Sequence, residues 1–581
     1  MSLNKLLSFM FFSFSFLIFF QDIHAADICV DTATDEAIVS VADCSASCGT
    51  VAPFCSLREA ITKANLTSAA DRIIFGIPGS APHTISLNTL LPPVTNPLMI
   101  DGLNGTELLA GSAPSIILQS GAVAANTGLD IQASNTTIAG IQVLHFSDDG
   151  IRIAGASSVQ NVVVGPSNVI SGNGEGIRIG ENTDHITVKG NLIGTDPSGS
   201  SVMGNQGGIT LTNVTHDDVI GGPLPGDGNV ISGTVTYGAG YGGVGISIGV
   251  FSHHNIIQNN KIGTDITGTL ALPNQKEGIK ISHGGSQNQV GPNNLISGNA
   301  SHGILMVPLP FSFDSTGNKI IGNKIGTARN GIDALGNDGS GIYIDGDSPA
   351  PVTHNHVLQT QIGGTVGVSL GGSCTGECNV IAFNHGDGIY LANTNQDSIL
   401  SNSIYSNVGS GLHLNSANND QVAPTISDAT LSGSVYHVNG AFTGLASTEH
   451  TIQLFANDTC DASAGEAKQL LATGNFTTDA SGNGSFSLDL NVMTGTVLTA
   501  SSTDNILKNT SSFSSCFNLP AAPTTPSATG GSDTGSDTTS SGRSGGCSLQ
   551  DQRSVSVFGL EILCIAYFFT YCWMRRRLAL V

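Results

Sequence analysis

The stretch N168-V-I-S-G-N-G-E-G-I-R-I179 decides the fold, because its pattern recurs through the middle of the chain. An NxIxxN segment followed shortly by G[IL]x[ILM] occurs in four copies, which begin at Asn168, Asn294, Asn379 and Asn402. A longer version, with the same Asn-to-Asn distance in every copy, begins at Asn191, Asn260 and Asn323. Repetition of this kind is typical of solenoid proteins.

Each copy ends in a short alternating stretch such as Gly176–Ile179, whose large aliphatic side chains point to one face of a strand. So short a strand becomes stable when it pairs in parallel with its equivalent in the next coil, about 4.8 Å away, around a shared apolar interior. Asn tolerates a left-handed turn conformation, and stacked amides can hydrogen-bond between coils. We expect such a turn ladder at Asn173, Asn299, Asn384 and Asn407. The repeats predict an all-β solenoid over 73–420, with about fifteen coils of roughly 20 to 25 residues.

These coils resemble those of right-handed parallel β-helix proteins, the pectin-lyase-like superfold. The resemblance implies a right-handed parallel β-helix for this chain. Enzymes on this superfold cleave acidic or neutral polysaccharides, so the resemblance also raises the hypothesis of a lyase or hydrolase. A fold alone does not establish a reaction, and the chain must supply a site.

Residues 26–72 precede the first strand expected in the solenoid and contain the sequence C55-S-L-R-E-A-I61. Ser56 followed three residues later by Glu59 is a capping box, and aliphatic residues recur at helical spacing after it. The pattern predicts a short helix that caps the open end of the solenoid. The same letters resemble the N-terminal region of bacterial CSLREA-type surface proteins, which implies a cap and no reaction. Cys55 is interpreted as half of a disulfide rather than as a nucleophile, because no His lies nearby in sequence to activate it.

Eleven cysteines fall into groups along the chain. In an exported protein the first eight predict four disulfides, within the cap, in a C-x3-C pair and across a later region. These residues are Cys29, Cys44, Cys48, Cys55, Cys374, Cys378, Cys460 and Cys516. The alternative of a zinc site in the cap is disfavoured, because the spacing matches no zinc-finger pattern.

Both ends of the chain carry apolar segments. Residues 1–25 have the basic start, apolar run and small-residue cleavage site of a secretory signal peptide, with an uncleaved anchor as the alternative. Residues 519–546 are rich in Pro, Ser, Thr, Gly and Asp, which predicts a disordered linker. Residues 547–581 contain an apolar segment long enough to form a transmembrane helix, followed by three arginines that favour a cytoplasmic C-terminus.

The succession of a Gly/Ser/Cys motif, an apolar span and arginines resembles the C-terminal sorting tails of bacterial envelope proteins. The resemblance implies cleavage near Cys547 and transfer to the cell surface. A plain single-pass anchor is the alternative. In either case we expect an exported protein of the cell envelope or cell surface, which is membrane-anchored at its C-terminus unless the tail is processed.

Between the solenoid and the linker, residues 421–518 contain alternating segments such as Thr451–Phe455 and Ser485–Leu490, separated by turn residues. This pattern predicts a small β-sandwich of immunoglobulin-like size. The region offers no cluster of titratable side chains. We therefore expect it to serve as a spacer or cap rather than as a catalytic domain.

Candidate catalytic residues are few. A glycosidase requires two carboxylates about 5 to 9 Å apart at one sugar bond. The local candidates are the neighbouring pair Asp217 and Asp218, and the pair Asp345 and Asp347 further along the chain. The alternative interpretation is that these are solvated turn residues, and the repeat pattern favours it.

Two further patterns suggest metal ligands. His185 and His254 occupy one register of the coils, with His354 in the same register, so a shared metal is one interpretation and a polar turn ladder is the other. Asp196 and Asp265, in two G-T-D loops, suit calcium, but the third equivalent loop lacks the carboxylate. We expect no metal or other cofactor, with calcium as the alternative.

The three longer coils insert their extra residues at the same turn, so they should wall a shallow groove suited to an extended glycan. A net charge of −23, from 20 Lys and Arg against 43 Asp and Glu, argues against nucleic acid as a partner. The sequence predicts a secreted, surface-anchored β-helix protein that binds glycans or acts in adhesion or envelope structure. The alternative is an extracellular polysaccharide lyase or glycoside hydrolase, and the non-catalytic function is favoured.

Overall fold

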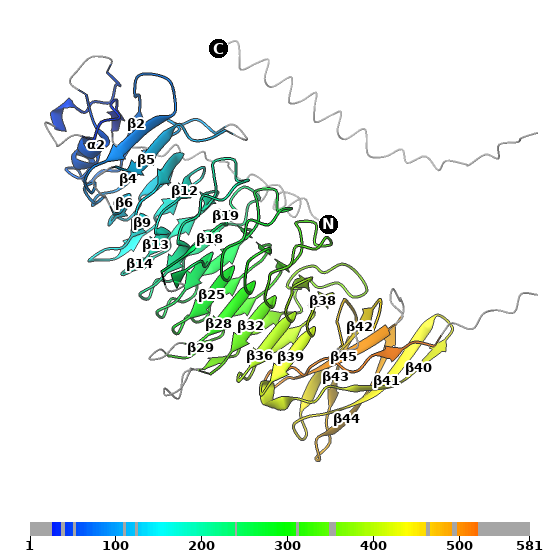
Figure 1. The fold of residues 1–581 in the computed structure, drawn as a ribbon. Coiled ribbons are helices and arrows are strands. Elements are labelled where there is room, and N and C mark those ends of the chain that lie inside the picture. The colour runs from blue at the N-terminus through cyan, green and yellow to red at the C-terminus, as the bar shows by residue number, and fades with distance from the viewer. Residues whose placement is uncertain are drawn as a thin grey trace, which may run out of the picture. The chain divides into compact units, whose positions relative to one another are not determined.

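The computed structural model describes residues 26–35, 41–49, 54–108, 112–121, 126–238, 241–308, 313–347, 356–460, 465–490 and 497–520. Within them the chain winds repeatedly through three long parallel sheets and then enters two antiparallel sheets (Figure 1). Each full coil adds one short strand to each of the three parallel sheets, which we call sheets A, B and C. The predicted all-β parallel β-helix is confirmed.

The strands of the three sheets are paired in chain order. Sheet A comprises β1 (Asp27–Val30), β2 (Asp71–Phe75), β4 (Leu98–Asp101), β7 (Thr137–Ala139), β11 (Val163–Val164), β15 (Thr187–Val188), β18 (Val219–Gly221), β23 (Ile256–Gln258), β26 (Gln289–Val290), β30 (Lys319–Ile320), β34 (Gln361–Gly363) and β37 (Ser398–Leu400). Sheet B comprises β3 (His83–Leu87), β5 (Ile116–Ser120), β8 (Ile141–Leu144), β12 (Val169–Ser171), β16 (Leu192–Ile193), β19 (Val230–Ile231), β24 (Lys261–Ile262), β27 (Leu295–Ile296), β31 (Lys324–Ile325), β35 (Val380–Ala382) and β38 (Ser403–Tyr405). Sheet C comprises β6 (Leu129–Ile131), β9 (Asp149–Ile153), β13 (Glu175–Ile179), β17 (Gly207–Leu211), β22 (Ile246–Ile248), β25 (Ile279–Ser282), β28 (Ile304–Val307), β32 (Ile342–Asp345), β36 (Ile389–Ala392) and β39 (Leu412–Asn415).

One apolar core runs along the inside of the three sheets. In sheet C the G-I-x-I stretches pair in register, so that Ile177 aligns with Ile209, and Ile209 with Ile246. All three side chains are fully buried. The alternation seen in the sequence therefore places one face of each strand in the core and the other in solvent, which leaves the outward residues and the turns to carry function.

Asn side chains connect successive coils at the turns. The predicted ladder is confirmed, since Asn299 Nδ2 donates to Asn337 Oδ1 at 2.8 Å and Asn384 Nδ2 to Asn407 Oδ1 at 2.9 Å, and the backbone N–H of Asn173 donates to Asn205 Oδ1 at 2.8 Å. A second ladder joins residues just before the strands of sheet B, with spacings from 23 to 56 residues. Because many coils are longer than expected, the longest sheet has 12 strands rather than about fifteen.

The N-terminal region closes the first coil. Helix α2 (Leu57–Ala64) has the predicted capping box, in which Ser56 Oγ accepts from Glu59 N–H and the Glu59 carboxylate accepts from Ser56 N–H. The apolar face of α2 joins the core of the solenoid. Disulfides Cys29–Cys48 and Cys44–Cys55 hold this region together, and Cys55 is fully buried, as expected for a structural cysteine. β1, within the predicted cap, is already the first strand of sheet A.

A two-sheet β-sandwich follows the last coil. One sheet contains β40 (Thr425–Ser432), β41 (Val435–Thr443) and β44 (Asn483–Leu490), and the other contains β43 (Gln469–Thr477), β42 (Glu449–Asn457), β45 (Val497–Asp504) and β46 (Phe517–Asn518). The two sheets share an apolar core of their own. Disulfide Cys460–Cys516 lies in this region, and Cys374–Cys378 lies in the β-helix.

The sandwich contacts the last coils of the β-helix. Ala467 forms an antiparallel bridge with Ile404 of β38, the last strand of sheet B. Thr510 Oγ1 accepts from Ile399 N–H of β37 at 2.9 Å. These contacts pair strand edges that would otherwise be open, which supports the interpretation of the sandwich as a cap.

The remaining regular elements are short. They are the 3-10 helices η1 (Val41–Asp43) and η2 (Asn418–Asp420), and the two-stranded pairs β10 (Val159–Gln160) with β14 (Thr183–Asp184), β20 (Thr236–Tyr237) with β21 (Tyr241–Gly242), and β29 (Ser315–Thr316) with β33 (Val357–Leu358). In the described part of the chain, no helix has both the length and the apolar character to cross a membrane. The expected signal peptide, linker and C-terminal transmembrane helix lie outside the described residues.

Candidate functional site

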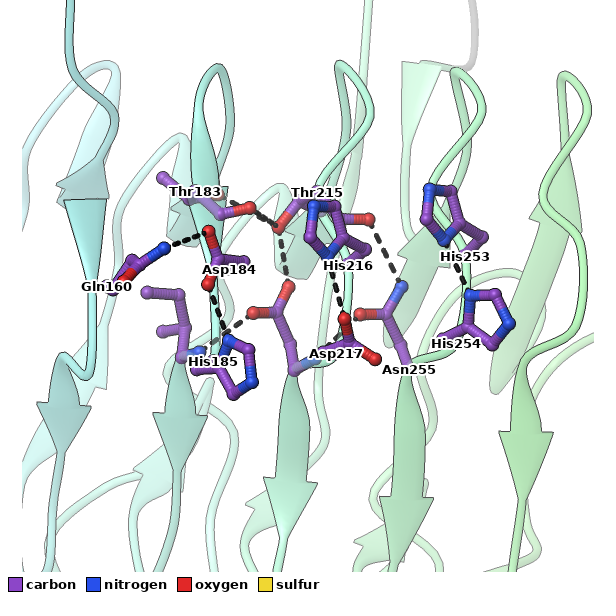
Figure 2. Close-up of polar contacts among 12 residues, drawn as sticks. Gln160, Thr183, Asp184, His185, Thr215, His216, Asp217, His253, His254 and Asn255 are labelled. Atoms are coloured by element: carbon purple, nitrogen blue, oxygen red, sulfur yellow. Dashed lines mark hydrogen bonds and ion pairs between the residues drawn. The ribbon is translucent and has the colours of Figure 1, made fainter. Parts of the chain in front are cut away.

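Acidic and imidazole side chains gather at the turn from sheet C to sheet A in three successive coils (Figure 2). Isolated parallel bridges align Asp184 with His216 and His216 with His253. The next residue of each coil forms a second column beside the first. We call these six residues, Asp184, His216, His253, His185, Asp217 and His254, the His–Asp strip.

Backbone geometry explains part of this composition. The second column is left-handed, with φ of 57° at His185 and 58° at both Asp217 and His254. Among non-glycine residues, Asn, Asp and His adopt this region most readily. The left-handed turn therefore accounts for His and Asp in the second column. The first column is extended, and its backbone conformation does not explain why Asp184, His216 and His253 occupy it.

Side chains of the strip pair within each coil. His185 Nδ1 lies 2.5 Å from Asp184 Oδ1, and Gln160 Nε2 donates to Asp184 Oδ2 at 2.9 Å. In the next coil His216 Nδ1 lies 2.8 Å from Asp217 Oδ2. In the third coil the two partners are both histidines, whose Nδ1 atoms are 2.8 Å apart.

The rings of His216 and His253 are stacked, with centroids 5.0 Å apart and planes 4° from parallel. Stacking along the solenoid keeps these two side chains in order from one coil to the next.

The pKa values of two histidines move in opposite directions. The hydrogen bond with the Asp184 carboxylate raises the pKa of His185, whereas burial, together with two neighbouring histidines, lowers that of His253. Burial also acts on Asp184, but hydrogen bonds from His185 and a glutamine outweigh it, so the pKa of Asp184 is lowered. Groups whose pKa values are shifted apart in this way are candidates for an acid and a base.

A hollow of about 560 Å³ borders the strip, lined by Asp184, His216 and His253 together with amide and hydroxyl side chains, the carboxylate of Glu181 and the aliphatic side chain of Val214. The side chains of His185 and Asp217 are 60% and 47% exposed. The site is open, and most of its lining side chains are polar, with Val214 exposed beside them. It can exchange hydrogen bonds and protons with a ligand lying across several coils.

Asp218, the second predicted catalytic residue of this region, does not reach the hollow. Its side chain is fully buried and accepts from Ile186 N–H at 2.8 Å and from Thr215 Oγ1 at 2.5 Å, while its own N–H donates to Asn255 Oδ1 at 2.9 Å. Asp218 thus occupies a position of a third turn ladder, which continues through Asn255 and Asn288. Burial raises its pKa to about 7.

Asp345 and Asp347 lie at the same turn but far from the strip. Strands β22, β25 and β28 separate β17, which precedes Asp217, from β32, which contains Asp345, a distance of about 20 Å along the solenoid. Asp345 Oδ1 accepts from Asp347 N–H at 3.2 Å, and His356 Nδ1 lies 3.8 Å from Asp347. The two predicted pairs of carboxylates are therefore not brought together. His354 lies outside the described residues.

The predicted register of His185 and His254 is the second column of the strip, but Asp217 lies between them. His216 directly precedes the predicted pair Asp217 and Asp218 and belongs to the same candidate cluster in the sequence, whereas its stacking partner His253 was not predicted. Asp218 and Asn255 occupy equivalent positions of the third ladder. His216 and His253 each lie two residues before these positions, so an alignment of the coils on this ladder would have placed the two histidines in one column.

Asp196 and Asp265 use their carboxylates within their own turns. Asp196 accepts from Ser198 Oγ and from two backbone N–H groups, and Asp265 makes the equivalent set with Thr267 Oγ1 and its own loop. No group of three or more His, Cys, Asp or Glu side chains arranged to hold a metal ion occurs among the described residues.

A buried ion pair on sheet C was also missed by sequence reasoning. Arg178 Nε donates to Asp149 Oδ1 at 2.8 Å, and the Asp149 side chain is 2% exposed. Burial raises the pKa of Asp149 to about 6 although Arg178 opposes the shift. Because the carboxylate is enclosed, it offers no reactive group, and Arg178 offsets part of the cost of burying it.

No protein-family model and no curated protein sequence matches the chain. Among solved structures, it is similar to the periplasmic alginate epimerase AlgG, with 12% identity over 60% of this chain and 69% of that chain and a TM-score of 0.27. It is also similar to the A-module of the Azotobacter vinelandii mannuronan C-5 epimerase AlgE4, with 12% identity over 61% and 92% and a TM-score of 0.30.

A third similar structure is the tailspike protein gp49 of Acinetobacter baumannii bacteriophage Fri1, a capsular polysaccharide depolymerase, with 6% identity over 78% of this chain and 79% of that chain and a TM-score of 0.23. Scores this low carry no argument about what the chain does. Its parallel β-helix is established by its own strand pairing.

Proposed function

We propose that this protein binds an extended, hydroxyl-rich polysaccharide across the His–Asp strip. The observation that carries the proposal is the ordered placement of carboxylate and imidazole groups from three successive coils beside one open hollow. Adhesion or a structural role in the envelope would follow from such binding.

The chemistry of the strip suits sugar hydroxyls. A hydroxyl both donates and accepts, and the strip offers carboxylates that accept next to imidazoles that can do either. The groups repeat with the coils, about 4.8 Å apart, so that a chain lying along the solenoid meets similar partners at each step. Most side chains that line the hollow are polar, which disfavours a compact apolar ligand.

The test uses the full-length chain in mild detergent on an array of polysaccharides, followed by affinity measurement on the best binders. The double variant His216→Ala, His253→Ala removes the stacked pair and should weaken binding about 10-fold, the loss expected for two hydrogen bonds of roughly 0.5 to 1.5 kcal/mol each. The matched control is His437→Ala, which removes an exposed histidine paired at 2.6 Å with Asp489 in the sandwich. Absence of any binder, or equal affinity of the double variant, would refute the proposal.

Cleavage of the bound polysaccharide is the second candidate function. The observation that favours it is that the pKa values of His185 and His253, in the same strip, are shifted in opposite directions, as expected for a candidate acid and a candidate base. Release of reducing ends or of unsaturated products by the wild type, and its loss in His185→Gln with binding retained, would establish cleavage. Binding without product across the array would leave the non-catalytic function.

We further propose that the protein acts outside the cytoplasm. Four disulfides in the described chain indicate an oxidising compartment. Anchoring through the C-terminal segment is part of this proposal and rests on sequence pattern. Protease treatment of intact cells, with release of the β-helix from the surface, tests it; recovery of the protein only inside the cell would overturn it.

A further inference from the structure

The third coil of the His–Asp strip differs from the other two in the chemistry of its pair. In the first and second coils a histidine is paired with a carboxylate, whereas in the third coil His253 is paired with His254. His254 is left-handed, with φ of 58°, and the imidazoles of these neighbouring residues meet at the surface of the turn (Figure 2). The third coil therefore places two nitrogen ligands at one point.

The separation of these two nitrogens matches that of a metal chelate. The Nδ1 atoms of His253 and His254 lie 2.8 Å apart. Imidazole nitrogen binds first-row metal ions at about 2.0 Å, so two nitrogens at adjacent corners of a square lie about 2.8 Å apart, and two at corners of a tetrahedron about 3.3 Å. The observed separation therefore favours ions with square or tetragonal coordination, Cu(II) and Ni(II), over tetrahedral Zn(II).

The surroundings leave the paired edges of the two rings open to an ion. The ring planes of His253 and His254 are 86° apart, with centroids at 4.9 Å. His216 stacks on the face of His253, so it does not occupy the edge that carries Nδ1. Within the described part of the chain, their mutual contact is the one hydrogen bond that either imidazole makes. An ion can therefore enter between the two nitrogens without breaking a bond to a third residue.

The protein supplies two ligands to such an ion. Since the described residues contain no group of three or more His, Cys, Asp or Glu side chains arranged around one point, water completes the coordination. The carboxylate-bearing residue Asp217 precedes His254 in the second column, one coil away, at a strand spacing of about 4.8 Å. Its negative charge attracts a divalent cation at this range without contact.

We propose that His253 and His254 chelate a divalent transition-metal ion, with Cu(II) and Ni(II) preferred over Zn(II). The ion takes the position of the proton between the two Nδ1 atoms, and the ring that carried this proton takes one on Nε2 instead. Metal binding goes beyond polysaccharide binding and does not depend on it, because the ion contacts the imidazoles directly.

Calorimetry of the untagged full-length chain in mild detergent tests the proposal. The chain is stripped with a chelator and titrated with Cu(II), Ni(II) or Zn(II) in the absence of polysaccharide. His254→Asn removes one imidazole and keeps a residue that tolerates the left-handed turn, and His253→Gln removes the other. His385→Asn is the matched control, since His385 is an exposed histidine of the β-helix whose partner is a carboxylate, Asp338 at 3.1 Å, rather than a second histidine.

We expect Cu(II) to bind the wild type, and Ni(II) to bind at least as tightly as Zn(II). His254→Asn and His253→Gln should each weaken Cu(II) binding at least about 10-fold, because even a residue that only orients a metal ligand contributes that much. His385→Asn should bind as the wild type does. The electron paramagnetic resonance spectrum of the Cu(II)-loaded wild type should show coupling to two imidazole nitrogens, which a folding defect in a variant cannot imitate.

Four outcomes would overturn the proposal. They are no binding of Cu(II), coupling of Cu(II) to a single nitrogen, tighter binding of Zn(II) than of Ni(II), and wild-type affinity in both His254→Asn and His253→Gln. Failure of the two proposals is distinguishable. Polysaccharide binding without Cu(II) binding would overturn the metal site alone, and Cu(II) binding without polysaccharide binding would overturn the proposed function alone.

Discussion

Replacing Asp218 by Asn should abolish the loss of folding stability that the β-helix suffers when the Asp218 carboxyl ionises at higher pH. Asp218 holds the ladder position that Asn255 holds in the next coil. Asn255 Nδ2 donates to Thr215 O, one coil back. An ionised Asp218 cannot donate at all, whereas a protonated one can donate to Thr215 Oγ1, which in turn reaches Thr183 O at 3.2 Å. The protonated carboxyl of Asp218 can therefore donate a hydrogen bond toward the preceding coil, as the Asn255 amide does.

The magnitude follows from the pKa of Asp218, which burial raises from 3.8 to about 7. One pKa unit corresponds to about 1.4 kcal/mol, so ionisation of Asp218 costs the folded state up to about 4 kcal/mol. Between these two pKa values the folded state binds more protons than the unfolded state. The contribution to stability is therefore complete below pH 3.8 and is lost as the pH rises through about 7.

Hydrogen exchange of the segment around Asp218, compared with Asp218→Asn from pH 4 to pH 8, measures the effect. We expect similar protection near pH 4 and at least about 30-fold greater protection of the variant at pH 8, which corresponds to about 2 kcal/mol, half of the upper value. Asp217→Asn is the control, because Asp217 is adjacent and 47% exposed. Equal pH dependence in the wild type and in Asp218→Asn would refute the reasoning.

Three further predictions concern stability. Asn294→Ala should lower the melting temperature by several degrees, because Asn294 makes four ladder hydrogen bonds while 1% exposed and each unsatisfied buried partner costs about 1 to 3 kcal/mol. Arg178→Met should destabilise more at pH 8 than at pH 5, since it leaves Asp149 buried without its cation and raises the pKa of that carboxyl further; thermal melts at the two pH values measure it. Cys44→Ser should cost at most about 3 kcal/mol for this short loop and make the N-terminal cap susceptible to limited proteolysis.

Features set by local repetition were predictable from the sequence. The repeated position of Asn299 and Asn384 in their coils predicted a ladder, because equivalent amides must align when the coils stack. The capping box at Ser56 and Glu59 depends on residues three apart and needs no tertiary information. Coil number was overestimated because insertions such as the one that separates Asn323 from Asn379 lengthen a coil without breaking the pattern.

The candidate site was less predictable, since it depends on which residues of different coils become neighbours. Asp217 and Asp218 are adjacent in sequence, yet one is exposed in the strip and the other is sealed in a ladder. Asp184 and His216 are far apart in sequence and become bridge partners. Their register is set by the third ladder, which follows each first-column residue by two positions. That ladder was hard to see in the sequence because its residue is Asp218 in one coil and Asn255 in the next.

The three turns of a coil differ in how many exposed side chains they offer to a ligand. Turns from sheet A to sheet B are often short, as at 189–191, and their ladder amides are buried, so they offer little to a ligand. Turns from sheet C to sheet A expose two side chains per coil just before a ladder residue, and the strip arises where these are His and Asp. Turns from sheet B to sheet C accept insertions whose loops stack into a wall over the outer face of sheet B. A β-helix of this kind can therefore hold a polar strip at one turn and a wall of stacked loops at another without altering its core, because neither feature uses an inward-facing residue of the three sheets.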